Sequence, residues 1–434
     1  MPSASVPEPD TVPALAAGSR RRDHPLTRSV SGMVGLAFLG LMFIACLGTL
    51  PWTLSAADPG VSEVPRYDSG DPKSGRLPPV WWPYDEIDSA RSLAAVDQGV
   101  VARIAEERGT SVEAVLDGSD VAGHQEAMEY APSFVLGSDT LGRSLGVRLL
   151  TGGGISLAIG ICAALISVGI GTVYGAVAAY MGGKVDSFMM RVVDVLYGLP
   201  YILLVVLLAV ASNAMLDEYQ SRSKAKTSWS IGQIIQTQVD ESGEPLSKSQ
   251  ARVVFENDPV LQDELMLEAA QIYPRREFSS GTRTMLDVLT LLIAIGGVSW
   301  LTMARVIRGQ VLSLKNQPFI EAARAMGSPG RRVFFRHLLP NLIGPIVVYA
   351  TLAVPQAILQ ESFLSFLGIG VKPPLPSWGN LAAEGLSELN TYRSHWWLLF
   401  FPCALLGLTL LAMNFVGEGL REAFDPKRSR SHNR

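Results

Sequence analysis

The sequence has little of the chemistry that catalytic and metal-binding sites use. Among its 434 residues there are three cysteines and five histidines, and the histidines are scattered without metal-ligand spacing. All three cysteines lie inside apolar runs, where cysteine behaves as a small hydrophobic residue rather than a disulfide partner. Neither a G-x-x-x-x-G-K-[ST] phosphate loop nor an H-E-x-x-H zinc motif occurs. We therefore predict no metal, no cofactor and no catalytic residue.

Charge is also scarce, and what there is lies between long apolar runs. Charged residues make up 18% of the chain and hydrophobic residues 48%. Buried helices of a large soluble protein are the alternative interpretation, but charges confined to the gaps between runs argue against it. Each run is long enough to cross a ~30 Å hydrocarbon core as a helix. We predict an all-α integral membrane protein with six transmembrane helices, at Gly32–Leu50, Leu149–Gly183, Val195–Leu216, Val288–Ala304, Leu338–Gln360 and Trp396–Gly417.

Lysine and arginine are distributed unequally between the two sides of these spans. They gather before the first run and after the second, fourth and sixth, whereas the segment after the first run is rich in Asp and Glu. The positive-inside rule then places both termini in the cytoplasm. The expected order is a cytoplasmic tail (1–31), a first span (32–52), an extracytoplasmic insertion (53–134), a membrane core (135–418) and a cytoplasmic tail (419–434). The core contains a second extracytoplasmic insertion (212–283) and a cytoplasmic loop (306–341). The insertions either cover the outer mouth or contact an external partner.

Small residues and prolines within the spans predict how the helices pack. Gly171, Gly175 and Ala179 recur every four residues in the second run, so they share a helix face that another helix can approach closely. Pro200, Pro345, Pro355 and Pro402 fall inside predicted spans and bend them, which is tolerated only against protein or a wet cavity. Such a bundle is typical of a transport path, and a receptor or a membrane-embedded enzyme is the alternative. Ionisable residues such as Asp194, Asp287 and Glu361 are confined to span ends, which disfavours a proton-driven carrier.

The polar stretch between the fourth and fifth runs has its own helical signals. Pro318 suits a first helical position after a cap at Gln317 or Asn316, and Gly327 suits the left-handed position that ends a helix. Ser328 would cap a second helix beginning at Pro329, and Pro340 would begin the next span. A solvated basic loop is the simplest alternative. A DNA-binding helix–turn–helix is excluded because its second helix would run directly into the bilayer, so we predict no nucleic-acid partner.

This stretch, "EAARAMGSPGRRVFFRHLLPN", resembles the E-A-A motif of ATP-binding-cassette importer permeases. The resemblance extends to "LGSDTLGRSL", "MRVVDVLYGLPYILL", "ESFLSFLGIGVKPPLPSWGN" and "AMNFVGEGLREAFDPK", which are similar to the shorter permease type of the dipeptide, oligopeptide and nickel branch. It implies a type I importer permease fold in which the loop is a coupling helix docked on an ATPase. The matching positions are Glu321, Ala322, Ala323, Gly327, His337, Pro340 and Asn341.

The same resemblance implies the partners and the function. We expect two cytoplasmic ATPase subunits, a second permease subunit, an extracytoplasmic substrate-binding protein and the bilayer of a cell inner membrane. The expected role is a translocation path for di- or oligopeptides, with ATP hydrolysed by the partners and no enzymatic step in this chain. Ala323 is expected to lie against the ATPase. The alternatives are nickel or another small solute as cargo, or, in a different class, a secondary carrier or channel.

Overall fold

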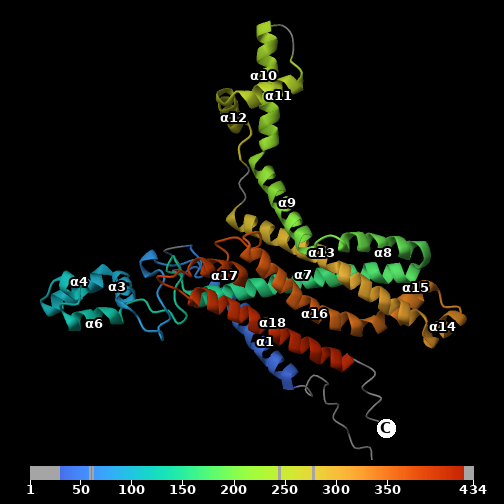
Figure 1. Cartoon of the computed structure of the whole chain (residues 1–434), viewed down its shortest axis with the longest axis horizontal. Coiled ribbons are helices and arrows are strands. Elements are labelled where there is room, and N and C mark those ends of the chain that lie inside the picture. The colour runs from blue at the N-terminus through green and yellow to red at the C-terminus, as the bar shows by residue number, and fades with distance from the viewer. Residues whose placement is uncertain (1–29, 58–59, 61–62, 243–245, 276–278, 425–434) are drawn as a thin grey trace, which may run out of the picture.

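The computed structural model describes residues 30–57, 60, 63–242, 246–275 and 279–424 (Figure 1). Within these ranges the chain is helical, and its only β-type pairing consists of isolated bridges. The arginines before the first span and the basic residues after residue 424 lie outside the described ranges. The predicted all-α fold is confirmed.

Six helices are long and apolar enough to cross a membrane, as predicted. Their spans are Gly32–Thr53, Leu145–Met181, Tyr201–Ser221, Gly281–Lys315, Gly330–Phe366 and Trp397–Glu422. The corresponding main elements are α1 (Val30–Gly48) with α2 (Leu50–Thr53), α7 (Leu145–Met181), α9 (Tyr201–Ser221), α13 (Ser280–Lys315), α16 (Leu339–Phe366) and α18 (Trp397–Phe424).

Helix α7 is the central element of the bundle and packs against α13 and α16, while α1 packs against α18. Close approach depends on glycine: a Cβ added at Gly35 of α1 would lie 2.8 Å from the Ala412 carbonyl oxygen of α18. At 37 residues, α7 is about 55 Å long, well beyond a ~30 Å hydrocarbon core. Its last turns therefore extend past the hydrocarbon region together with the neighbouring end of α13.

The third predicted span is broken by Pro200. Helix α8 (Gly183–Tyr197) runs back along α7, and a new helix, α9, begins at Tyr201 with Pro200 as its N-cap residue. The prediction that Pro200 lies inside a span is therefore wrong. Proline has no N–H and disfavours helical geometry at the residue before it, so the chain turns at Leu199. Helix α9 then diverges from the bundle and is followed by α10 (Ser223–Ser242) (Figure 1).

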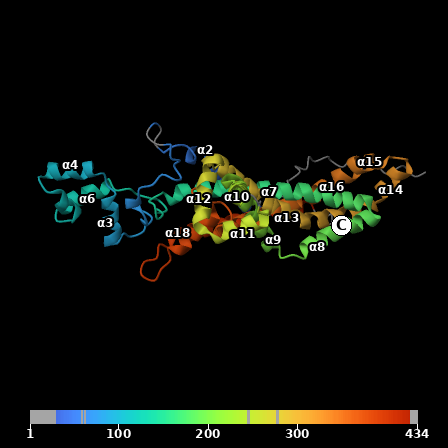
Figure 2. The same cartoon turned by 90° about the horizontal axis from the view of Figure 1, so that it is seen from above.

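The two insertions are small helical units outside the bundle. The first contains η2 (Pro72–Ser74), α3 (Glu86–Ala94), α4 (Gln98–Arg108), α5 (Val112–Leu116) and α6 (Val121–Glu129). Its helices enclose their own apolar core around Val101, Ile104 and Val115. The second insertion is α10 with α11 (Lys248–Asn257) and α12 (Pro259–Ile272), because α9 and α13 extend into the predicted range 212–283. Helices α3 to α6 and the loop helix α14 (Pro318–Ala325) lie at opposite ends of the molecule in both views (Figures 1 and 2).

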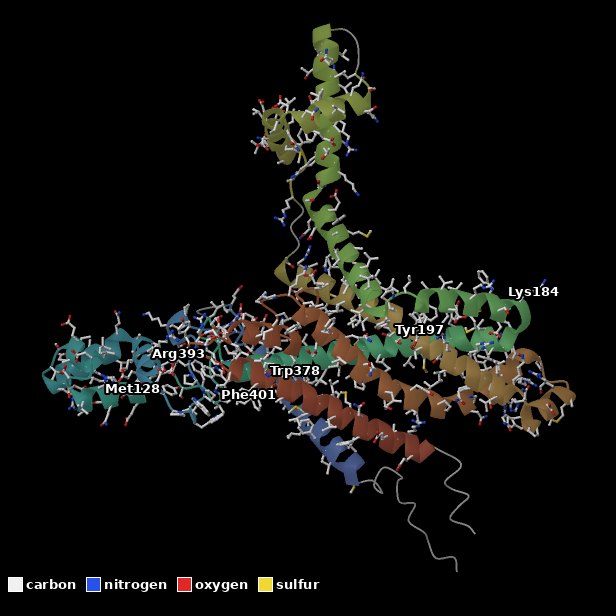
Figure 3. All side chains as sticks on the ribbon, viewed as in Figure 1. Met128, Lys184, Tyr197, Trp378, Arg393 and Phe401 are labelled. Atoms are coloured by element: carbon white, nitrogen blue, oxygen red, sulfur yellow. The ribbon has the colours of Figure 1, made fainter. Side chains whose placement is uncertain are left out.

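A charged network that the sequence analysis missed attaches the first insertion to the bundle. Arg148, in the first turns of α7, is only 1% exposed and pairs with Asp139 at 2.7 Å and Glu384 at 2.6 Å. Glu384 lies in α17 (Trp378–Ser387). Beyond it, Arg393 pairs with Asp85 at 2.8 Å, beside the start of α3 (Figure 3). Arg143 joins the insertion to this network, because it pairs with Asp139 and with Asp68 of the insertion, both at 2.7 Å. The pair with Asp139 is buried, and a buried pair is costly to break on one side.

Candidate functional site: a coupling loop and a polar cavity

Helix α14 begins and ends as its sequence predicts. Pro318 occupies the first turn, and Gln317 is the N-cap residue, although its side chain makes no capping bond. Gly327 has φ +76°, and the Ser328 N–H bonds to the Ala323 carbonyl at 3.1 Å. This bond across a left-handed glycine is the Schellman pattern that terminates helices. The conformation predicted for Gly327 is confirmed.

The second part of the loop differs from the prediction. Ser328 is not a cap: α15 (Gly330–Val333) has Pro329 as its N-cap residue. A π-helical segment, η3 (Phe334–Leu338), then leads without a break into α16, whose first turn contains Pro340. The Leu339 N–H bonds to the Phe334 carbonyl, which is the wider i→i+5 spacing. Because the helix is continuous, a displacement of α15 must be transmitted to α16.

The apolar face of α14 packs against its own chain. Ile320 is 0% and Ala323 2% exposed, and both pack with Val333 and Leu338. The prediction that Ala323 lies against a partner is therefore wrong. The alanine is small because α15 and η3 cross close to α14, and its spacing of three from Ile320 places both side chains on one inward face.

Most of the remaining motif residues are exposed, and one of them is partly buried. Glu321 and Ala322 are exposed on α14, as are Phe319 at 42% and Met326 at 80%. In the second half of the loop His337 is partly buried, whereas Pro340 and Asn341 are exposed. The Asn341 Nδ2 donates to the His337 carbonyl at 2.6 Å. The outward face of α14 thus combines two large apolar side chains with a small one, which suits contact with another surface.

The buried face of α14 packs against the ends of the long helices α7 and α13 and against η3. Tyr180 of α7, Leu314 of α13 and Phe334 of η3 surround its buried residues. A Cβ added at Gly330 would lie 2.4 Å from the Tyr180 hydroxyl, so the loop lies directly on the end of α7. Nearby, the Lys315 ammonium donates to the Tyr180 carbonyl at 3.3 Å. Helix α14 therefore packs on the ends of α7 and α13 and on η3, which continues into α16.

The small residues predicted to pack lie on the face of α7 that meets α13. A Cβ added at Gly175 would lie 2.2 Å from the Ala304 carbonyl oxygen, and one at Gly171 would lie 2.5 Å from the Met303 Cβ. Ala179 is fully buried in the same contact. The two helices therefore approach at backbone distance, which gives the rigid pair through which the loop meets the membrane core.

A cavity of about 600 Å³ lies between these helices. Its lining comes from α7 (Ala164, Ser167, Val168), the α8–α9 junction (Leu196, Tyr197, Leu199, Tyr201), α13 (Val298, Ser299, Leu301, Thr302, Met303) and α16 (Tyr349, Leu352, Ala353, Gln356, Ala357, Gln360). The break at Pro200 allows residues from both sides of the α8–α9 junction to line the cavity, and Tyr197 marks this junction in Figure 3.

Three polar side chains join three helices at the cavity wall. The Tyr201 hydroxyl donates to Gln360 Oε1 at 2.6 Å and lies 2.7 Å from Ser299 Oγ. Sequence analysis singled out none of the three. The available signal was the presence of Ser299, Gln356 and Gln360 inside otherwise apolar runs. Only the fold reveals that α13 and α16 turn these residues toward a common space.

Comparison with known proteins identifies the family to which this chain belongs. The family described as binding-protein-dependent transport system inner membrane component matches residues 171–430. The oligopeptide transport system permease protein OppC of Haemophilus influenzae is 37% identical over 291 residues, covering 67% of this chain and 70% of that protein. The dipeptide transport system permease protein DppC of Bacillus subtilis is 36% identical, covering 67% of this chain and 68% of the relative.

A third relative, OppC of Escherichia coli, is 37% identical over 311 residues, covering 72% of this chain and 78% of its own length. The matched range contains the loop 306–341, the cavity-lining parts of α13 and α16, and α18. This chain belongs to the family of binding-protein-dependent transport system inner membrane components, as an ATP-binding-cassette importer permease of the C type.

Proposed function

We propose that this chain is the permease subunit of an ATP-driven importer that takes up di- and oligopeptides. It would pair with a second permease subunit and two cytoplasmic ATPase subunits, and receive its cargo from an extracytoplasmic binding protein. The observation that carries the proposal is the short helix α14, which exposes an apolar outer face while its inner face rests on α7, α13 and η3.

The mechanism follows from this arrangement. When the ATPase subunits close around ATP, the outer face of α14 would be displaced with them. Its buried residues, Ile320 and Ala323, would carry the displacement to Tyr180 and Leu314 at the ends of α7 and α13. Since η3 continues directly into α16, three of the helices that line the cavity, α7, α13 and α16, would move together. The chain itself performs no covalent step in this scheme.

The proposed orientation places both termini and α14 in the cytoplasm and the α3–α6 unit outside. Exposed arginines gather on the loop at one end, including Arg324, Arg331 and Arg332, while the insertion at the other end is acidic. This asymmetry obeys the positive-inside rule. It supports the assignment of the loop 306–341 as cytoplasmic and of the segment 53–134 as extracytoplasmic.

Peptide is favoured over nickel by the chemistry of the cavity wall. The polar groups there are hydroxyls and carboxamides, which both donate and accept hydrogen bonds and therefore suit the amide groups of a peptide. A transition-metal ion instead selects imidazole, thiolate or carboxylate ligands. The relatives are oligopeptide and dipeptide transport system permease proteins, which supports the same choice.

The coupling role can be tested by placing a charge on the outer face of α14. Ala322→Asp and Met326→Asp should leave folding and membrane insertion unchanged, because both side chains are exposed. In a packed contact an unpaired charge should weaken ATPase binding at least ~tenfold. The measurement is retention of the ATPase subunits on purification, together with substrate-stimulated ATP hydrolysis.

The control is Ser187→Asp, a similar change at an exposed position on α8. It should retain the ATPase subunits like the unaltered chain. Ala323→Asp is unsuitable for this test, because Ala323 is buried and the change would disrupt the packing of α14 against its own chain. Assembly and ATP hydrolysis at unaltered levels in both Ala322→Asp and Met326→Asp would sink the proposal that α14 is the ATPase-coupling element.

A further inference from the structure

Two polar side chains on the cavity wall are exposed although they lie far from the ends of their helices. Thr302 is in α13 (Ser280–Lys315) and Gln356 in α16 (Leu339–Phe366), and both are exposed. A glutamine facing lipid would leave its amide without hydrogen-bond partners, at a cost of several kcal/mol in hydrocarbon. The cavity face therefore meets water, permeant or protein rather than acyl chains.

The polar groups of the wall share one chemistry. Tyr201, Ser299, Thr302, Gln356 and Gln360 offer hydroxyl and carboxamide groups, and the lining residues that the structure describes carry no formal charge. Hydroxyls and carboxamides both donate and accept hydrogen bonds. Such a wall pairs equally well with N–H and C=O groups, while it gives little electrostatic preference for cationic or anionic side chains.

Part of this wall is held in a fixed arrangement before any ligand arrives. Tyr201 bonds to Gln360 and lies beside Ser299, so α9, α13 and α16 are tied together at this point. Around it, Leu352, Ala353 and Val298 supply apolar surface. The volume of about 600 Å³ falls within the ~300–1,000 Å³ range of small-ligand sites. A rigid polar cluster in an apolar cavity orients a ligand without binding it tightly.

We propose that this cavity is the translocation site of the permease and that Gln356 and Thr302 hydrogen-bond the main-chain amides of the passing peptide. The inference rests on the proposed function and adds the groups that contact the cargo. Main-chain amides occur in every peptide, so a permease that recognises them can transport peptides of different sequence. Selection among side chains is then left to the binding protein.

The first experiment tests whether the cavity face is wet in the assembled transporter. Thr302→Cys and Gln356→Cys are reconstituted with the partner subunits and treated with a small hydrophilic thiosulfonate reagent. The native chain gives the background of Cys46, Cys162 and Cys403. The control is Leu359→Cys, on the same helix as Gln356 and 46% exposed but outside the cavity lining.

We expect both cavity cysteines to react well above background, Leu359→Cys to remain near background, and excess tetra-alanine to slow the cavity reaction several-fold. Equal reactivity at all three positions would overturn the inference. So would a cavity that reacts in the isolated chain but is blocked in the assembly, because a partner subunit would then cover it. Reaction without protection by tetra-alanine would exclude peptide contact at this wall.

The second experiment tests main-chain recognition. Uptake of tetra-alanine is compared with uptake of its N-methylated analogue, which lacks amide N–H groups, in the native chain, in Gln356→Leu and in the control Leu359→Ala. The binding protein is the same throughout, so a change in the uptake ratio belongs to the permease. We expect Gln356→Leu to lower the ratio about fivefold, the effect of one lost hydrogen bond, and Leu359→Ala to leave it unchanged.

The outcomes separate this inference from the proposed function. An unaltered ratio in Gln356→Leu, with normal tetra-alanine uptake by the native chain, would overturn main-chain recognition and leave the peptide importer standing. Failure of the native transporter to take up either peptide would overturn the proposed substrate, and the peptide-binding role of the cavity with it.

Discussion

At the residue scale, a buried histidine lies beside one of the ion pairs between the insertion and the bundle, Arg76–Glu388. His395 is 4% exposed, and its Nδ1 lies 3.1 Å from Glu388 Oε2. Burial lowers the pKa of His395 below its ordinary value of 6.5, although Glu388 acts in the opposite direction. The Arg76 hydrogen bond in turn lowers the pKa of Glu388. The positive charges of Arg76 and Arg393 also lower the pKa of His395, because they repel a proton on its ring.

The depressed pKa of His395 predicts that acidification destabilises this end of the molecule. The unfolded chain takes up the histidine proton at about pH 6.5 and the folded chain only at lower pH, so stability falls as pH decreases below about 6.5. Glu388 contributes in the same direction at still lower pH, because its pKa is lowered too. The melting temperature of the purified chain should decline between about pH 7 and about pH 5.5, and less so in His395→Asn. Parallel declines in both proteins would refute the assignment to His395.

At the element scale, glycine decides how closely α7 and α13 pack. The same helix offers a matched pair of positions. Gly175 faces the Ala304 carbonyl, whereas a Cβ at Gly169 would meet nothing within 4 Å. Helix propensity treats both glycines alike, since glycine costs roughly 0.5–1 kcal/mol relative to alanine in a helix. Only the presence of a packed neighbour distinguishes them.

Gly175→Ala should therefore destabilise the protein by about 1–3 kcal/mol through overpacking. Gly169→Ala should stabilise it slightly, through the ordinary helix preference for alanine. Thermal unfolding of the purified chain in detergent measures both effects. Melting temperatures that shift equally in the two variants would show that α7 and α13 do not approach as closely as the structure indicates.

At the scale of the whole molecule, the long helices separate two ends of different composition. Helices α3 to α6 lie at one end, and the arginine-rich loop containing α14 lies at the other (Figures 1 and 2). The length of α7 exceeds the hydrocarbon thickness, so at least one of its ends projects beyond the hydrocarbon core. Under the proposed function, one end would contact the external binding protein and the other the ATPase.

The proposed sidedness predicts the labelling of exposed positions in intact cells. Ser111→Cys in the first insertion and Ser249→Cys in the second should react with a membrane-impermeant maleimide, because both lie on the proposed outer side. Ala325→Cys in α14 should react only after permeabilisation. The unaltered chain reports any background from its three native cysteines. Reaction of Ala325→Cys in intact cells would reverse the proposed orientation.

Local patterns determined the elements of this protein. Apolar runs long enough to cross a membrane indicated the six spans. Pro318 and Gly327 indicated where α14 begins and ends, because proline and glycine act through backbone geometry that needs no distant partner. The recurring small residues likewise indicated which face of α7 packs closely, though not against which helix.

The tertiary structure alone decided which faces meet. Ala323 looked available to a partner in sequence, but α15 and η3 cover it, and no local pattern reveals such a crossing. Arg148 seemed to precede a span, yet α7 begins at Leu145 and buries it against Asp139 and Glu384, which is 236 residues away in sequence. Tyr201, Ser299 and Gln360 became one cluster only where three helices converge. Sequence governs what each segment can form, whereas contacts between distant segments depend on packing that the whole chain determines together.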